Sequence, residues 1–220
     1  MDEITREFES DFERSDLQEL VASVGDGAID ILANNDVISA FPVLGMLKGI
    51  YDITKNYQTN RLAKKIYKLI VGTSTLTSRQ KQQFLEEYTE ANKEEGAEVL
   101  LSLLDRIDNS NKIDVVSRLM ASRINNQITI EEFIRLTDAL EKLSFIDIQN
   151  LEKYKENHYV AGESEMIFTS GLIYTSFITP TSNSYRLSRL GWQFLKYGMG
   201  LDVTIPEAYP TENSAYAVLR

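Results

Sequence analysis

The sequence predicts a mainly α-helical protein whose C-terminal quarter departs from the helical pattern and forms a small α+β module. Through most of residues 1–160, apolar residues recur at three- and four-residue spacing, which is the pattern of amphipathic helices. Residues 171–178 are instead β-branched and aromatic, and a proline follows them at position 180. We therefore expect a multi-helix body over residues 1–160, a β-hairpin plus helix over 161–200, and an irregular tail over 201–220.

The first half of the body is expected to contain four helices. Apolar residues from Ile4 to Val21 fall roughly on one helical face, and a short helix is expected over residues 28–34. A helix that starts near Pro42 is apolar nearly all round, which is typical of a buried helix. From Arg61 to Val71 the pattern is amphipathic, and three lysines are placed mostly away from the apolar face, where we expect solvent.

The second half of the body is expected to contain four more helices, separated by polar turns. Thr77 or Ser78 is a suitable N-cap for the first of them, and residues 94–107 form the second. Residues 113–124 form the third helix, after which an Asn-Asn pair predicts a turn. Residues 129–132 (Thr-Ile-Glu-Glu) then read as a capping box that starts the fourth helix, because a hydroxyl and a carboxylate can satisfy each other's free amides.

The composition excludes several kinds of chemistry. The chain of 220 residues contains no cysteine, which removes disulfides, thiolate catalysis and thiolate metal sites. Its single histidine, His158, has no nearby carboxylates at metal-ligand spacing, so we interpret it as a surface or capping residue. Residues 128–133 resemble the end of an EF-hand loop, but Ala121 and Arg123 stand where oxygen ligands belong. We expect no catalytic residue, no metal and no small-molecule cofactor.

Charge is strongly segregated along the chain, although the net charge is −10. Residues 2–19 hold eight acids against Arg6 and Arg14, and no signal peptide is recognisable there. No acid lies between Asp52 and Glu86, a stretch with seven basic residues. A second acid-free stretch runs from residue 166 to 201 and holds three basic residues. No apolar run is long enough to span a membrane, so we expect a cytoplasmic protein.

Two phrases near the C-terminus resemble the end of a winged-helix domain. They are residues 170–173 (Ser-Gly-Leu-Ile) and residues 185–195 (Tyr-Arg-Leu-Ser-Arg-Leu-Gly-Trp-Gln-Phe-Leu), with Ser188 at the N-cap position and Gly191 at the glycine position. The resemblance implies a two-stranded wing followed by a last helix, and a recognition helix before Gly171. Residues 163–165 (Glu-Ser-Glu) lie in that place instead of a basic surface.

The order of several phrases is also similar to a loosely defined group of uncharacterised bacterial helical proteins with a winged-helix-like C-terminal segment. The phrases are residues 48–50 (Lys-Gly-Ile), the lysine-rich helix near residue 64, residues 103–108 (Leu-Leu-Asp-Arg-Ile-Asp) and residues 128–136 (Ile-Thr-Ile-Glu-Glu-Phe-Ile-Arg-Leu), followed by the wing-like end. No activity follows from this resemblance. It implies, by association, a role in conflict between phage and host.

Three functions remain open from the sequence. The first is a non-enzymatic interaction or regulatory protein that binds a protein partner or a second copy of itself. The second is a winged-helix nucleic-acid-binding regulator, and the third is a peripheral effector that touches anionic membrane surfaces through residues 37–70. The residues expected to bind nucleic acid or an acidic partner are Arg61, Lys64, Lys65, Lys68, Arg186 and Arg189. A single polyanion-binding surface requires that these lysines and arginines lie on one face.

Overall fold

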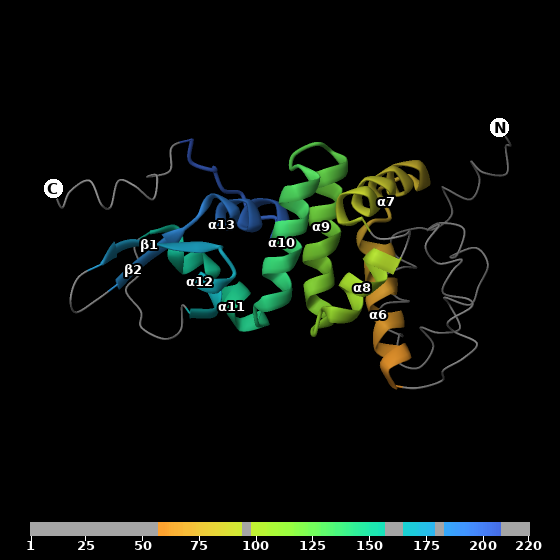
Figure 1. Ribbon diagram of the computed structural model, residues 1–220, viewed down its shortest axis with the longest axis horizontal. Coiled ribbons are helices and arrows are strands. Elements are labelled where there is room, and N and C mark those ends of the chain that lie inside the picture. Colours follow the sequence, from red (N-terminus) through yellow and green to blue (C-terminus); the bar gives the residue numbers. More distant parts are fainter. Residues whose placement is uncertain (1–56, 94–97, 157–164, 179–182, 208–220) are drawn as a thin grey trace, which may run out of the picture.

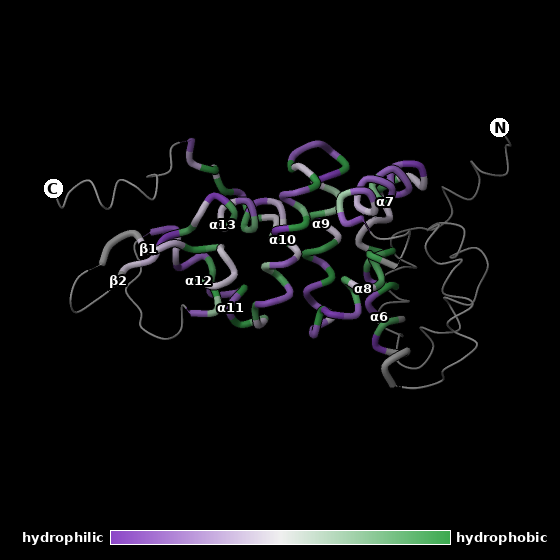
Figure 2. The backbone as a smooth tube through the Cα atoms, in the orientation of Figure 1, coloured by the Kyte–Doolittle hydropathy of each residue, from purple (hydrophilic) through white to green (hydrophobic). Residues whose placement is uncertain are grey.

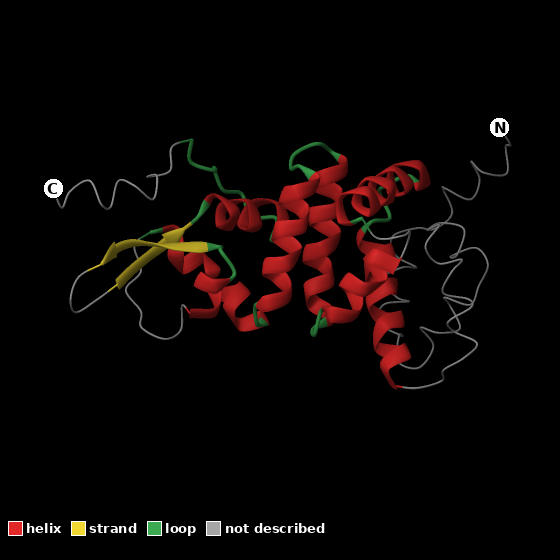
Figure 3. Cartoon of the chain, in the orientation of Figure 1, coloured by secondary structure: helices red, strands yellow, loops and turns green. Residues whose placement is uncertain are grey.

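The computed structural model describes residues 57–93, 98–156, 165–178 and 183–207. These residues are mainly helical and include one two-stranded sheet, as the sequence predicted (Figures 1 and 3). The helices expected before residue 57, most of the 37–70 segment, His158 and residues 208–220 lie outside the described residues. None of the described helices has the length and apolar character needed to cross a lipid bilayer.

Helices α6 (Tyr57–Gly72), α7 (Ser78–Asn92) and α8 (Glu98–Arg106) lie at one end of the described molecule (Figure 1). The predicted cap of α7 is confirmed, because the Thr77 hydroxyl accepts a hydrogen bond from the backbone N–H of Gln80. Helix α6 begins earlier than the amphipathic pattern indicated. The apolar face of α6, which includes the buried residues Ile66 and Leu69, packs against α9.

The centre of the molecule is the helix pair α9 (Ile113–Ile124) and α10 (Ile130–Lys142), which lie side by side (Figure 1). A short 3-10 turn, η1 (Ser110–Lys112), leads into α9. The predicted turn between the two helices is confirmed, and Asn126 adopts the left-handed conformation there with φ of 57°. The predicted capping box of α10 is also confirmed.

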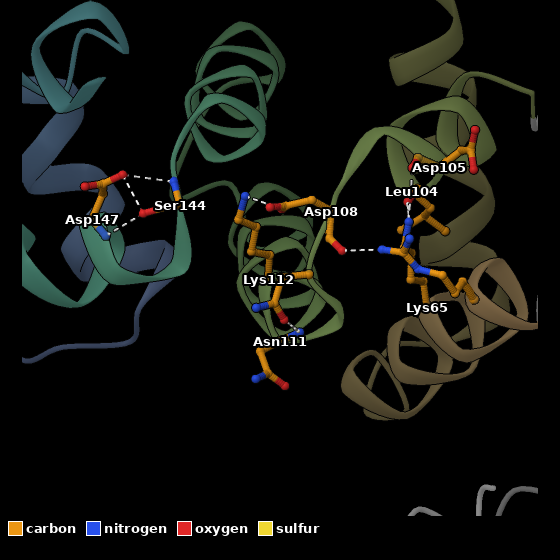
Figure 4. Close-up of polar contacts among 10 residues, drawn as sticks. Lys65, Leu104, Asp105, Asp108, Asn111, Lys112, Ser144 and Asp147 are labelled. Carbon is orange, nitrogen blue, oxygen red and sulfur yellow. Dashed lines mark hydrogen bonds and ion pairs between the residues drawn. The ribbon is translucent and has the colours of Figure 1, made fainter. Parts of the chain in front are cut away.

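Three short elements that the apolar pattern did not predict follow α10. They are α11 (Phe145–Asn150), η2 (Leu151–Lys155) and α12 (Glu165–Thr169). Helix α11 has a capping box of its own, in which Ser144 and Asp147 satisfy each other's backbone amides (Figure 4). Each element is too short for apolar periodicity to indicate a helix, so the pattern before the strands was not informative.

The C-terminal departure from helix is confirmed as an antiparallel strand pair followed by a short helix. Strand β1 (Ile173–Ile178) pairs with β2 (Asn183–Leu187), with a bulge between Thr175 and Phe177. Helix α13 (Arg189–Gln193) continues into a π-helical turn, η3 (Phe194–Gly198). The predicted N-cap is correct, because the Ser188 hydroxyl accepts a hydrogen bond from the backbone N–H of Gly191.

Gly191 explains how closely α13 packs on the strand pair. A Cβ atom at this position would lie 2.1 Å from the backbone oxygen of Leu172 and 2.9 Å from a methyl carbon of Leu187. Only glycine therefore permits this approach of helix to strand. Gly171, by contrast, has free space around it but a φ of 81°, the left-handed region that glycine adopts without strain.

One hydrophobic cluster extends from α6 through α9 and α10 to α13 (Figure 2). Near α7, the rings of Phe84 and Tyr88 both meet Phe133 of α10 edge-on, with centroids 5.0 and 5.4 Å apart. At the C-terminal side, Phe194 and Leu195 are fully buried, and Gly198 lies against α9. The helix after the strand pair therefore shares its core with the helical body.

Candidate interaction surfaces

Lys65, one of the basic residues predicted on α6, lies beside the C-terminal end of α8 (Figure 4). The ammonium of Lys65 donates hydrogen bonds to the backbone oxygens of Leu104 and Asp105, at 2.8 and 3.0 Å. The last carbonyls of a helix have no partner within the helix and carry partial negative charge, so a cation is favourable there. Lys65 therefore caps α8 from a neighbouring helix.

Two further residues of this set contact the turn that follows α8. The Arg61 guanidinium donates to the backbone oxygen of Asp108 at 2.7 Å. The Lys68 ammonium donates to Oδ1 of Asn111 at 3.0 Å. Lys64 is exposed. Three of the four predicted basic side chains on α6 thus bind either the last residues of α8 or the turn that follows it.

The expectation of a lysine-rich solvent face is wrong for Lys65, which is only 4% exposed. The apolar pattern of α6 placed this lysine on the polar side of the helix, but α8 ends against that side and covers it. Burial lowers the pKa of Lys65; the carboxylates of Asp105 and Asp108 oppose this shift, and the nearby charge of Arg61 adds to it.

A buried lysine stabilises the same turn from the other side. Lys112, at the start of α9, is completely buried, and its ammonium lies 2.5 Å from Oδ1 of Asp108 (Figure 4). Partial burial raises the pKa of Asp108, but the ammonium of Lys112 outweighs it and holds that pKa below its ordinary value. The α8–α9 turn is therefore a place where cations and acids are paired, which reduces its attraction for an external polyanion.

The two arginines predicted in the C-terminal module are exposed, but they lie far from α6. Arg186 lies on β2, and Arg189 is the first residue of α13. Figure 1 places the strand pair and α6 at opposite ends of the long axis of the molecule. The structure thus does not bring the predicted lysines and arginines together on a single surface.

A different surface lies between α12 and the strand pair, and the sequence did not single it out. The large hydrophobic side chains that stand exposed among the described residues are Ile146, Met166 and Phe168, at 67%, 51% and 46%. Met166 and Phe168 both belong to α12. The Phe168 ring meets the ring of Tyr185 on β2 at 65°, with 5.9 Å between the centroids.

Arg189 is connected to this apolar surface through the backbone around Gly171. The N–H of Gly171 donates to the Phe168 oxygen at 3.0 Å, and the Ser188 hydroxyl donates to the Gly171 oxygen at 2.7 Å. The residue after Ser188 is Arg189, which is exposed, so its backbone lies close to the end of α12. We call Met166, Phe168, Tyr185 and Arg189 together the α12 surface.

Two glutamates of the helical body have structural partners. Glu132 accepts from the Thr129 backbone N–H at 2.9 Å and from the Gln193 amide at 2.6 Å, which joins the start of α10 to α13. Glu87 forms an ion pair with Arg123 at 2.8 Å. Within the described ranges, no group of three or more acidic or histidine side chains is arranged to hold a metal ion.

The fold and its surfaces define a mainly helical protein with a C-terminal strand pair and an exposed apolar patch beside that pair. Comparisons with protein-family models, with curated proteins and with solved structures find no match to this chain. Its function is therefore inferred from the chemistry of its own surfaces.

Proposed function

We propose that this chain is a non-enzymatic interaction protein of the cytoplasm that binds a protein partner through the α12 surface. The observation that supports the proposal is the exposure of Phe168 beside Tyr185, with Met166 exposed on the same short helix. Large apolar side chains grouped on a surface mark binding sites for other proteins, and aromatic residues are frequent anchors of such sites.

The exposed apolar area is large enough to matter for binding. If a phenylalanine side chain presents about 200 Å² when free, an exposure of 46% leaves roughly 90 Å² of Phe168 in contact with water. Covering that area stabilises a complex by about 2 kcal/mol at the usual coefficient for apolar surface. Met166 is 51% exposed and offers a similar apolar area to a partner. Two such anchors make α12 a credible centre for an interface.

The surface favours a protein over a nucleic acid as partner. In the winged-helix interpretation of residues 161–200, α12 takes the place of the recognition helix, and its described residues are one acid and four uncharged residues. Nucleic-acid binding depends on several cations that contact phosphates. Arg186 and Arg189 are the basic residues of β2 and of α13, and the lysines of α6 are remote from them.

Site-specific photo-crosslinking tests the proposal. A photoreactive amino acid at position 166 is compared with the same amino acid at position 83, because Gln83 is exposed on α7 at the other end of the molecule. We expect a discrete protein adduct from position 166 that Phe168→Asp abolishes. Identical adducts from both positions, or an adduct that survives Phe168→Asp, would count against the α12 surface.

The nucleic-acid alternative is tested by titration with duplex DNA at a low and a high salt concentration. Phosphate contacts are strongest at low salt, so a nucleic-acid-binding protein should bind the duplex at least under that condition. We expect no binding at either salt concentration. Tight binding at low salt that Arg186→Glu and Arg189→Glu remove would favour the winged-helix nucleic-acid function instead. Co-sedimentation with anionic liposomes tests the membrane alternative in the same way, and the proposal expects the protein in the supernatant.

A further inference from the structure

We infer that the α12 surface binds the chain's own acidic N-terminal segment, residues 2–21, when no partner is bound. The inference rests on the function proposed above, since it names how access to that surface is regulated. A partner would have to displace the segment, which makes the contact autoinhibitory. Charge, apolar pattern and chain length each support it.

The N-terminal segment has the composition of an acidic amphipathic peptide. It holds eight acids against two arginines. Ile4, Phe8 and Phe12 are spaced four residues apart, which places them on one face of a helix. Amphipathic segments of this kind bind by laying their apolar face on an exposed hydrophobic surface.

The α12 surface is complementary to this segment in both respects. Its apolar part consists of Met166, Phe168 and Tyr185, which offer rings and a thioether to the phenylalanines. Its charged part belongs to the stretch from residue 166 to 201, which contains no acid and three basic residues, although the net charge of the chain is −10. The backbone of Arg189 lies near the last turn of α12, at the other end of that helix from its one acid, Glu165, and a long, exposed guanidinium there can pair with the acids that flank Phe8.

The other basic region is less suited to the segment. Lys65 is buried under α8, while Arg61 and Lys68 already donate to the turn after α8. The carboxylates of Asp105 and Asp108 lie close enough to Lys65 to affect its ionisation. The basic side of α6 is therefore partly neutralised, and the described residues do not expose there the large apolar side chains that α12 exposes.

The length of the intervening chain permits binding within one molecule. Between residue 21 and Tyr57 the extended backbone reaches about 120 Å. That is several times the radius of gyration of roughly 17 Å expected for a compact chain of this length. Tethering of this kind gives an effective concentration near the millimolar range. The segment of the same molecule therefore competes successfully with that of a second copy at ordinary protein concentrations.

The cysteine-free sequence allows a direct test in the full-length chain. The variant Ser10→Cys with Glu165→Cys places one thiol in the segment and one at the exposed start of α12, without removing an apolar contact. The control is Ser10→Cys with Glu86→Cys, which replaces an exposed acid on α7. With oxidised glutathione as the oxidant, we expect the first pair to form a disulfide at monomer mass at least about tenfold faster than the control pair, because binding raises the local thiol concentration.

Two more substitutions make the result specific. Phe12→Asp or Arg189→Glu, added to the first pair, should reduce its rate to that of the control. Equal rates for the two original pairs would overturn the inference, and so would a product found only at dimer mass, which would assign the contact to a second copy. A fast rate that neither substitution changes would also overturn it.

Failure of this inference is distinguishable from failure of the proposed function. The partner adduct from position 166 is measured again in the Phe12→Asp chain, where we expect at least about threefold more adduct because the competing segment is weakened. An unchanged adduct overturns autoinhibition and leaves partner binding intact. Fast disulfide formation without any partner adduct supports the intramolecular contact and refutes partner binding.

Discussion

The substitution Lys65→Met separates a structural role of the α6 lysines from a role in binding. Methionine keeps most of the length and the apolar stem of lysine but removes the ammonium. The backbone oxygens of Leu104 and Asp105 then lose the donor that lies 2.8 and 3.0 Å away. Because Lys65 is 4% exposed, water does not readily replace the lost donor at the Leu104 oxygen.

The two hydrogen bonds of Lys65 determine how much Lys65→Met should lower the free energy of unfolding. A hydrogen bond from a charged donor contributes about 1.5–3 kcal/mol when it is buried. The contact with Leu104 is buried, whereas the contact with Asp105 is only partly buried and is more easily replaced by water. The apolar thioether recovers part of the loss by filling the same space. We therefore expect Lys65→Met to lower the free energy of unfolding by about 2 kcal/mol.

Urea unfolding followed by circular dichroism measures this change, with Lys64→Met as the matched control. Lys64 is exposed on the same helix, so its substitution should change the free energy of unfolding by less than about 0.5 kcal/mol. The urea midpoint should move while the slope stays constant. Equal effects of the two substitutions would refute the assignment of Lys65 as the cap of α8.

Three further predictions concern pH, a buried hydroxyl and a close helix–strand contact. Burial lowers the pKa of Lys65 below 10.5, so the unfolded chain binds more protons there than the folded chain at alkaline pH. The free energy of unfolding of the native chain relative to that of Lys65→Met should therefore rise as the pH increases toward 10.5, and a flat difference would contradict this. The Tyr67 hydroxyl is buried and has no hydrogen-bond partner among the residues that the structure describes, so Tyr67→Phe should raise the free energy of unfolding by about 1 kcal/mol in a urea titration. A lower free energy of unfolding would contradict this expectation. Gly191→Ala should lower the free energy of unfolding by about 3 kcal/mol, because its Cβ would lie 2.1 Å from the Leu172 oxygen. Gly171→Ala is strained only by its φ of 81° and should lower it by about 1 kcal/mol. Thermal unfolding of both variants tests this order.

The long elements were predictable because one physical rule determines them. Helices α9 and α10 are long enough for apolar residues to repeat over three turns, and their buried faces match that repeat. The caps at Thr77, Thr129 and Ser188 were equally predictable, because a side-chain oxygen that accepts from the first turn is a local property of the sequence. The strand pair followed from β-branched composition and the proline after it.

The partners of the basic side chains were not predictable from local pattern. The sequence shows that Lys65 is on the polar side of α6, but not that α8 ends against that side. Which carbonyls need a donor depends on where a second helix stops in space, 39 residues away along the chain. The same holds for Lys112, whose position at the start of α9 gave no sign that it is buried completely.

The exposed side chains of α12 did have a signal in the sequence, which is the run Met166, Ile167, Phe168. Neighbouring residues of a helix point in directions about 100° apart, so three consecutive apolar residues cannot all face one core. Ile167 is 1% exposed and takes the buried position, which leaves its two neighbours in solvent. A run of three apolar residues on a very short helix therefore indicates either a buried helix or an exposed binding surface.

Helix α12 has only five residues, a length that does not form a stable helix alone. Its conformation is held by local contacts: the Ser170 hydroxyl donates to the Ile167 oxygen at 2.6 Å, and the Thr169 hydroxyl donates to the Met166 oxygen at 3.0 Å. Burial of Ile167 then anchors the helix to the core. These contacts order Met166 and Phe168 before anything binds them, which reduces the entropy that a partner must remove. An apolar pair that the fold holds in place but does not bury contributes little to stability, and this combination favours a role in binding.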